Sequence, residues 1–153
     1  MTENPAATEL RARTAEPRQA PEIRALIDRF VADGTLLPRT EEFIREHAGS
    51  FVVVEDERRH VVGCAHLDEY APSLGELRSL AVSPEAQGRG VGRALVAAID
   101  ALARRRDITT LFAVSNDEAF FRRHGFEPRH IPELDRERSA VSRYKGVFAK
   151  AVD

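Results

Sequence analysis

The stretch Gln87–Gly92, QGRGVG, constrains the fold most, because it joins an apolar run to an apolar-periodic segment. Three of the chain's nine glycines stand at positions 88, 90 and 92. After them, one helix face is traced by Val91, Leu95, Ala98, Ile99 and Leu102. Glycines let successive backbone N–H groups turn toward one point, and a helix N-terminus adds a positive end. The stretch therefore predicts a strand–loop–helix unit that binds a phosphate or pyrophosphate.

The stretch does not match the other glycine-rich motifs that bind phosphate groups. A dinucleotide-binding loop needs G-x-G-x-x-G, but Arg93 stands where its third glycine belongs. A Walker A loop needs Lys-Ser/Thr after its second glycine, and the chain has none there. A plain strand-to-helix turn would need only one glycine. Arg89 and Arg93 are placed to add charge-assisted hydrogen bonds to a bound anion.

The rest of the pattern predicts an α/β fold with a mixed sheet flanked by helices. Expected strands are 10–14, 51–55, 61–67, 74–82 and 110–114, with an edge strand at 147–149. Expected helices are 21–31, one capped by Thr40, one starting near Gly90, and 118–124 closed by Gly125. The charged link between 55 and 61 favours an antiparallel hairpin.

Composition limits the class of protein. A chain of 153 residues with 42% hydrophobic content and a net charge of −2 predicts one domain over 9–153, after a disordered 1–8. Nothing indicates a nucleic-acid or membrane partner, and a cytoplasmic location is the default. The single Cys64 is expected to be a small core residue, and no metal site is expected.

The motif resembles that of the GNAT-type N-acetyltransferases, Q/R-x-x-G-x-G/A after a strand that ends here in Ser83-Pro84. Asn116-x-x-Ala119 with Phe121-x-x-x-Gly125-Phe126 resembles the second cofactor-side motif of that family. The resemblance implies the GNAT acyl-CoA N-acyltransferase fold and acetyl-CoA as co-substrate, without a metal. The implied cofactor-binding residues are Leu80, Ala81, Val82, Gln87, Gly88, Arg89, Gly90, Val91, Gly92, Arg93, Asn116 and Phe121.

Several segments resemble more narrowly the acetyltransferase domain of bacterial N-acetylglutamate synthase. These are 34–40, 63–67, 75–82, 120–126 and the tail 143–148. The resemblance implies transfer of acetyl from acetyl-CoA to the α-amine of L-glutamate, the first step of arginine biosynthesis. The larger enzymes also carry an arginine-sensing, kinase-like domain, so a chain of this length is expected to be the short, stand-alone form.

An α-amine must lose a proton before it attacks a thioester, and a carboxylate can accept that proton directly or through a water. Glu76 stands on the strand that leads to the glycine loop, at the position of the family's proposed base. An exposed strand glutamate is the other interpretation of this residue. In a cleft, desolvation is expected to raise the pKa of Glu76 toward the working pH.

The carboxylates of the substrate call for arginines, whose planar fork binds them bidentately. Arg39 is the first candidate, followed by Arg78, which strand alternation places on the face of Glu76, and Arg143. We expect two of the three to bind substrate, the alternative for each being a surface arginine. Ser79 and Lys145 complete the expected substrate site.

The residues that usually protonate the departing thiolate in this family are not present at the matching positions. Phe121 occupies the position where many GNAT enzymes have a tyrosine, and Lys145 occupies that of the serine used by the glutamate class. Tyr144 is the catalytic acid that we predict, with Ser142 as its alternative.

Two other functions stay open. One is acetylation of another amine, such as a different acidic amino acid, a polyamine or a protein N-terminus. The other is a non-catalytic acyl-CoA-binding module. The sequence does not determine the oligomeric state, and a homodimer is one option.

Overall fold

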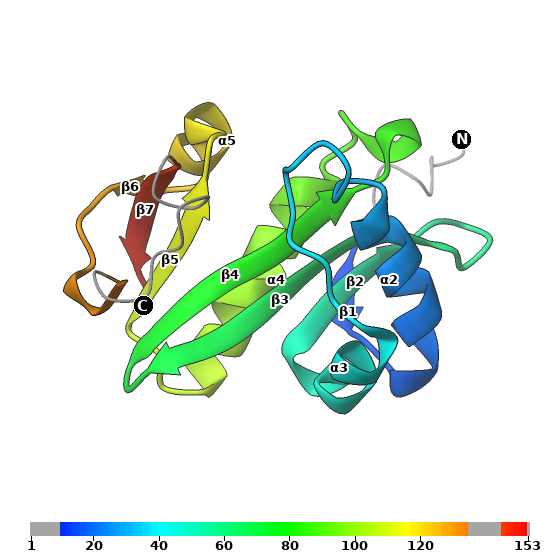
Figure 1. Cartoon of the computed structure of the whole chain (residues 1–153), viewed down its shortest axis with the longest axis horizontal. Helices are drawn as coiled ribbons and strands as arrows, with labels where there is room; N and C mark the ends of the chain where they lie inside the picture. Colours follow the sequence, from blue (N-terminus) through cyan, green and yellow to red (C-terminus); the bar gives the residue numbers. More distant parts are fainter. Residues whose placement is uncertain (1–9, 135–144, 153) are drawn as a thin grey trace, which may run out of the picture. The chain divides into compact units, whose positions relative to one another are not determined.

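The computed structural model describes residues 10–134 and 145–152. Its strands are β1 (Ala12–Thr14), β2 (Phe51–Glu55), β3 (Val61–Ala71), β4 (Leu74–Val82), β5 (Thr110–Ser115), β6 (Glu127–Pro128) and β7 (Gly146–Ala151). Its α-helices are α2 (Ala20–Asp28), α3 (Glu41–Glu46), α4 (Val91–Arg105) and α5 (Glu118–Arg123) (Figure 1). The sheet has the strand order β1-β2-β3-β4-β5-β7-β6, with β4 and β5 parallel. This confirms the predicted mixed sheet flanked by helices.

Most predicted elements are confirmed within a few residues. The register of β2 and β3 pairs Val53 with Cys64 in antiparallel fashion, as the charged link predicted. The Thr40 hydroxyl accepts a hydrogen bond from the Phe43 amide at 3.0 Å, which caps α3. Gly125, which follows the C-cap residue of α5, has φ +89°, as a left-handed residue after a helix requires.

One prediction about the edge of the sheet was wrong, and one strand there was missed. Residues 147–149 belong to β7, which lies between β5 and β6 rather than at the edge. The edge strand is β6, whose two residues were not predicted because so short a strand has no periodicity to detect. The expected disorder of residues 1–8 lies outside the described residues.

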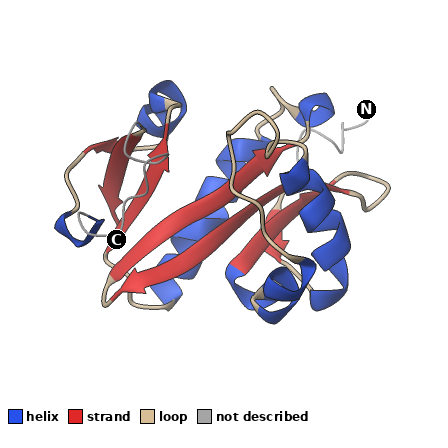
Figure 2. Ribbon diagram, in the orientation of Figure 1, coloured by secondary structure: helices blue, strands red, loops and turns tan. Residues whose placement is uncertain are grey.

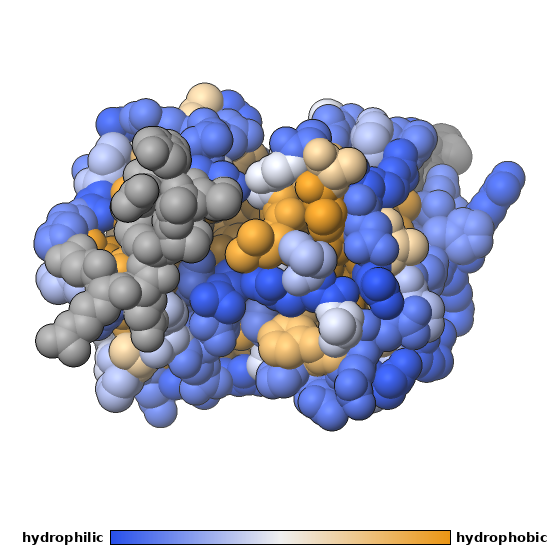
Figure 3. Space-filling model, in the orientation of Figure 1, coloured by the Kyte–Doolittle hydropathy of each residue, from blue (hydrophilic) through white to orange (hydrophobic). Residues whose placement is uncertain are grey.

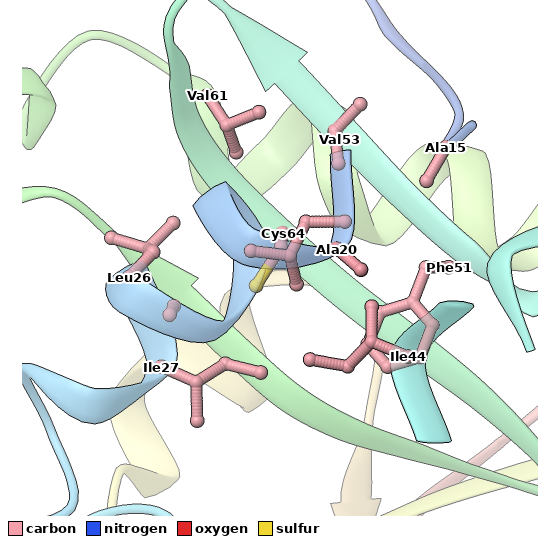
Figure 4. Packing of buried hydrophobic residues seen from close by; sticks show 11 residues of the cluster. Ala15, Ala20, Leu26, Ile27, Ile44, Phe51, Val53, Val61 and Cys64 are labelled. Atoms are coloured by element: carbon pink, nitrogen blue, oxygen red, sulfur yellow. The ribbon is translucent and has the colours of Figure 1, made fainter. Parts of the chain in front are cut away.

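The chain divides into two compact units, Met1–His66 with Ser79–Ile99, and Leu67–Arg78 with Asp100–Asp153. In the first unit, α2 and α3 cover one face of the strands (Figure 2). Ile27 from α2 and Ile44 from α3 meet Phe51 and Cys64 in one buried cluster (Figure 4). Each such large side chain contributes roughly 1.5–3 kcal/mol through burial.

The other face of β3 in this unit receives α4 at Gly63. A Cβ at Gly63 would lie 2.5 Å from Val91 Cγ1 and 3.1 Å from Leu95 Cδ1. Adjacent strand residues point to opposite faces, which is why Cys64 faces α2 while Gly63 faces α4. The glycine therefore allows the first turn of α4 to lie directly on the strand.

The second unit has its own core. Phe112 on β5 packs with Leu74, Ala149, Ile131 and Leu134. Tyr70 on β3 meets the Phe112 ring edge-on at 5.4 Å. None of the described helices is long and apolar enough to cross a membrane.

Candidate functional site

The glycine loop of the first unit has the backbone that the sequence predicted. Gly88 and Gly90 have φ +82° and +86°, in the left-handed region that favours glycine. Gln87 Nε2 donates to the carbonyl of Val82 at 3.1 Å, which ties the loop back to β4. The helix α4 begins at Val91, directly after the loop. Backbone N–H groups at a helix N-terminus suit a bound phosphate group.

A polar anchor that the sequence did not reveal fixes the start of this loop. Arg29, directly after α2, donates through Nη1 to Ser83 Oγ at 3.2 Å and through Nη2 to Glu85 Oε2 at 3.2 Å. The Ser83 hydroxyl in turn donates to Glu85. The hydrogen bonds from Arg29 and Ser83 lower the pKa of Glu85 to about 2. Arg29 and Ser83 are 54 positions apart in the chain, so no local sequence signal predicts this contact.

The predicted cofactor residues fall into two groups. Arg89 and Arg93 are exposed and, across residues 10–134 and 145–152, make no ion pair. Val91 and Ala81 are buried, so only their backbone groups remain for a ligand. The intermediate exposure of Leu80, Val82 and Gly92 leaves them partly accessible.

Ser79 interrupts the extended backbone of β4 directly before Leu80. It is a buried, non-glycine residue with φ +53°. Its carbonyl accepts a weak hydrogen bond from the Cys64 thiol at 3.4 Å. A left-handed residue inside a strand bends the strand and changes the direction of the groups that follow it. The sequence predicted an unbroken strand here, since serine carries no signal for this conformation.

Arg39 lies at the end of the loop between α2 and α3, one residue before the cap of α3. Its guanidinium lies 5.8 Å from the centre of the Phe43 ring, and Nη1 donates to the Pro38 carbonyl at 3.0 Å. Phe43 meets the buried His66 edge-on at 5.6 Å. Figure 3 shows hydrophobic surface near this loop, where Leu37 is 63% exposed. The arginine is thus held against an aromatic cluster.

The second unit contains the predicted base. Glu76 is buried, and its Oε1 accepts a hydrogen bond from Arg78 Nε at 2.7 Å. Arg78 Nη2 also lies 3.5 Å from Asp68 Oδ2. Burial alone would lower the pKa of Arg78, but the charge and hydrogen bond of Glu76 and the charge of Asp68 raise it. Glu76 and Arg78 share a face, as alternation predicted, and Asp68 is an additional partner that the sequence did not indicate.

The other predicted residues of this unit are less closely grouped. Asn116 is exposed after β5, whereas Phe121 is buried, parallel to Phe148 at 6.1 Å and edge-on to Phe126 at 5.1 Å. A cavity of about 260 Å³ is lined by Lys145 together with Arg129, His130, Ile131, Leu134, Gly146 and Val147. Arg143 and Tyr144, the third predicted clamp and the predicted acid, lie outside the described residues, as does Ser142.

Cys64 is a core residue, as predicted. It is fully buried, and burial raises the pKa of its thiol to about 12. Over the described ranges, no three His, Cys, Asp or Glu side chains come together as metal ligands.

A central strand of a mixed α/β sheet leads here through a positive-φ glycine turn into a helix N-terminus, an arrangement that suits a bound anion. The family model for the acetyltransferase (GNAT) domain matches residues 47–128, which include that turn. The chain belongs to the GNAT acetyltransferase family.

Its relatives include amino-acid acetyltransferases. That of Neisseria meningitidis is 37% identical over 136 residues, which are 88% of this chain but 31% of the relative. That of Mycobacterium tuberculosis is 34% identical over 128 residues, 82% of this chain and 73% of the relative. The chain thus spans about a third of the first and most of the second.

Among solved structures, N-acetylglutamate synthase from Neisseria gonorrhoeae, complexed with coenzyme A and N-acetyl-glutamate, superposes with a TM-score of 0.83. It is 31% identical, and the match covers 94% of this chain and 35% of that one.

Proposed function

We propose that this chain is an amino-acid N-acetyltransferase that transfers the acetyl group of acetyl-CoA to the α-amine of L-glutamate. The observation that carries the proposal is the composition of β4: it presents the Glu76–Arg78 pair and then runs through Leu80–Val82 into the glycine loop. The similarity to the Neisseria enzymes supports an amino acid as acceptor. A role in arginine biosynthesis, in the cytoplasm, would follow from that acceptor.

The glycine loop is the proposed site of the coenzyme A pyrophosphate. Gly88 and Gly90 expose backbone N–H groups, and Arg89 and Arg93 add positive charge at the surface. Backbone N–H groups near Leu80 and Val82, after the bend at Ser79, would polarise the thioester carbonyl. Asn116, which is exposed, is a further proposed cofactor-binding residue.

The proposed reaction is direct attack in a ternary complex. Glu76 accepts the proton of the α-ammonium, directly or through a water. The amine nitrogen then forms a bond to the acetyl carbonyl carbon and loses its second proton to solvent, while the carbon–sulfur bond breaks to release the coenzyme A thiolate. Tyr144 or solvent returns a proton to the sulfur. With a thiol pKa of about 8.5, taking cysteine as the guide, this leaving group needs little help.

Arg39 is the first choice for the substrate's carboxylate. Its planar fork is held against the Phe43 ring, which reduces the freedom it would lose on binding. Arg78 is a weaker choice than the sequence suggested, because its guanidinium already serves Glu76 and Asp68. Arg143, Lys145 and Ser79 remain further candidates for this site.

The test follows coenzyme A release from acetyl-CoA with a thiol reagent, against glutamate, aspartate, 2-aminoadipate, glutamine, ornithine and spermidine. We expect glutamate to be turned over well above the others. Glu76→Gln should lower kcat by about 10²–10⁴-fold, the usual contribution of a general base. Glu69→Gln is the matched control, since Glu69 is a neighbouring strand carboxylate paired with Arg106 at 3.1 Å.

Other outcomes separate the alternatives. Turnover of spermidine or another amine alone would keep the family and refute glutamate as the acceptor. Acetyl-CoA binding without turnover of any acceptor would identify a binding module, for which the absence of a tyrosine at Phe121 is the supporting feature.

A further inference from the structure

Three charged side chains meet on one face of the second unit. Arg78 on β4 lies between Glu76 of the same strand, at 2.7 Å, and Asp68 of β3, at 3.5 Å. The Glu76 side chain is 11% exposed, while those of Arg78 and Asp68 are each 32% exposed. One guanidinium therefore serves two carboxylates in a place that water reaches only in part.

Uncharged and aromatic side chains also surround this cluster within the unit. The partner of Glu76 in the register with β5 is Phe112, which carries no charge. Within this unit β3 also contributes Tyr70, whose ring meets Phe112 and whose hydroxyl donates to the Glu133 carbonyl at 3.3 Å. Arg78 thus contacts Glu76 directly, and Asp68 reaches Glu76 through the same guanidinium.

We infer that Asp68 is a positioning residue that sets the basicity of Glu76 by sharing Arg78 with it. An arginine devoted to Glu76 alone would stabilise the carboxylate and make it a poorer proton acceptor. Asp68 draws part of the guanidinium away and adds a like charge, and both effects favour the protonated form of Glu76. The inference rests on the proposed function, because basicity matters only if Glu76 accepts a proton.

The first test measures the titration of the Glu76 carboxyl in the absence of substrate turnover. The protein is labelled with ¹³C at the glutamate side-chain carboxyl, and the Glu76 signal is assigned by its loss in Glu76→Gln. We expect Asp68→Asn to lower the titration midpoint of Glu76 by about one pH unit. Glu69→Gln removes the same charge one residue away, on a side chain paired with Arg106, and should leave the midpoint in place.

The second test is the pH dependence of kcat at saturating substrates. Asp68→Asn should move the acid limb downward by the same amount and lower the maximal kcat severalfold, because a weaker base transfers the proton less well. The KM for acetyl-CoA should not change. A merely structural role of Asp68 would lower the melting temperature without moving the limb.

Arg78→Gln should shift the titration midpoint of Glu76 in the opposite direction, and it tests whether Asp68 acts through Arg78. Removing the cation should raise the midpoint of Glu76, and Asp68→Asn should then shift it by less than half as much as in the wild type. Arg78→Lys serves if Arg78→Gln does not fold, since an ammonium lacks the fork that holds two carboxylates.

The outcomes are separable. An unmoved or raised midpoint in Asp68→Asn overturns the inference, whatever the activity. A lowered midpoint in Asp68→Asn, reduced in the Arg78 background, supports it. If Glu76→Gln keeps the wild-type kcat and acid limb, the proposed base fails, and the role of Asp68 in catalysis fails with it.

Discussion

Gly63→Ala tests whether the glycine loop keeps its position only when α4, which follows it, packs closely on the sheet. The added Cβ would lie 2.5 Å from Val91 Cγ1 and 3.1 Å from Leu95 Cδ1, both on buried side chains. Carbon atoms in good contact lie roughly 3.5–4.0 Å apart, so the Val91 side chain must move by about 1 Å. Valine is branched next to its backbone, so part of that movement must be carried by α4 itself.

Overpacking of this kind costs about 1–3 kcal/mol. For a chain of this size, about 2 kcal/mol lowers the melting temperature by roughly 4–8 °C. Because Val91 is the first residue of α4, the same movement displaces the N-terminus that we propose to bind pyrophosphate. We therefore expect the KM for acetyl-CoA to rise severalfold in the folded variant.

The assay combines thermal unfolding, followed by circular dichroism, with the KM from coenzyme A release. Gly49→Ala is the control, because Gly49 is exposed and its Cβ would meet nothing within 4 Å. Gly63→Ala with Val91→Ala should be less destabilised than the sum of the two single variants, since the smaller side chain removes the clash. Strict additivity, or a Gly63→Ala variant as stable as the wild type, would refute the reasoning.

Two further predictions concern the first unit. Arg29→Ala should release Ser83 and Glu85 and so raise the KM for acetyl-CoA severalfold with little change in kcat. Arg24→Ala, on α2, is the control and should leave this KM unchanged. The pKa of Glu85 is lowered to about 2, so its contact with Arg29 is fully formed above the ordinary carboxyl range and is lost only as the pH falls toward 2. The effect of Arg29→Ala on the KM should therefore be constant from pH 6 to 9. Because burial raises the pKa of Cys64 to about 12 from 9.0, its thiol should resist a thiol reagent at pH 8 until the protein unfolds. The thiol of the unfolded chain ionises at lower pH than the buried one, so the free energy of unfolding should fall as the pH rises from about 9 toward 12. Cys64→Ala should lack this pH dependence. Rapid labelling of Cys64 in the folded protein would contradict its burial.

The sequence predicted the elements whose signals are local. The cap at Thr40 and the positive φ of Gly88 follow from the side chain, or its absence, at one position. The hairpin of β2 and β3 follows from two apolar runs joined by a charged link. The strand β6 was missed because its pairing with β7 depends on the tertiary fold rather than on its own two residues.

Other features depend on what the fold brings together. Gly63 was expected only as one residue of a strand, yet its missing side chain is what admits Val91. The positive φ of Ser79 has no propensity signal, since serine rarely adopts it. The contact of Arg29 with Ser83 joins residues far apart in the chain. Each of these lies close to the proposed cofactor loop in the sequence or contacts it.

The case of Arg78 shows why a correct pattern led to an incomplete role. Alternation correctly placed Arg78 on the face of Glu76, and the same spacing brings the two side chains within hydrogen-bond reach. An arginine two residues from a carboxylate on a strand can therefore bind that carboxylate, which competes with the binding of a ligand carboxylate. A substrate carboxylate would have to displace Glu76 or Asp68 from it, and each displacement would leave a partly buried charge without its partner. Arg39 lies against an aromatic ring and donates to a backbone carbonyl, two contacts that hold its planar fork in place without using Glu76 or Asp68. The choice between the two arginines thus depends on what already surrounds each guanidinium, a property of the fold rather than of the spacing.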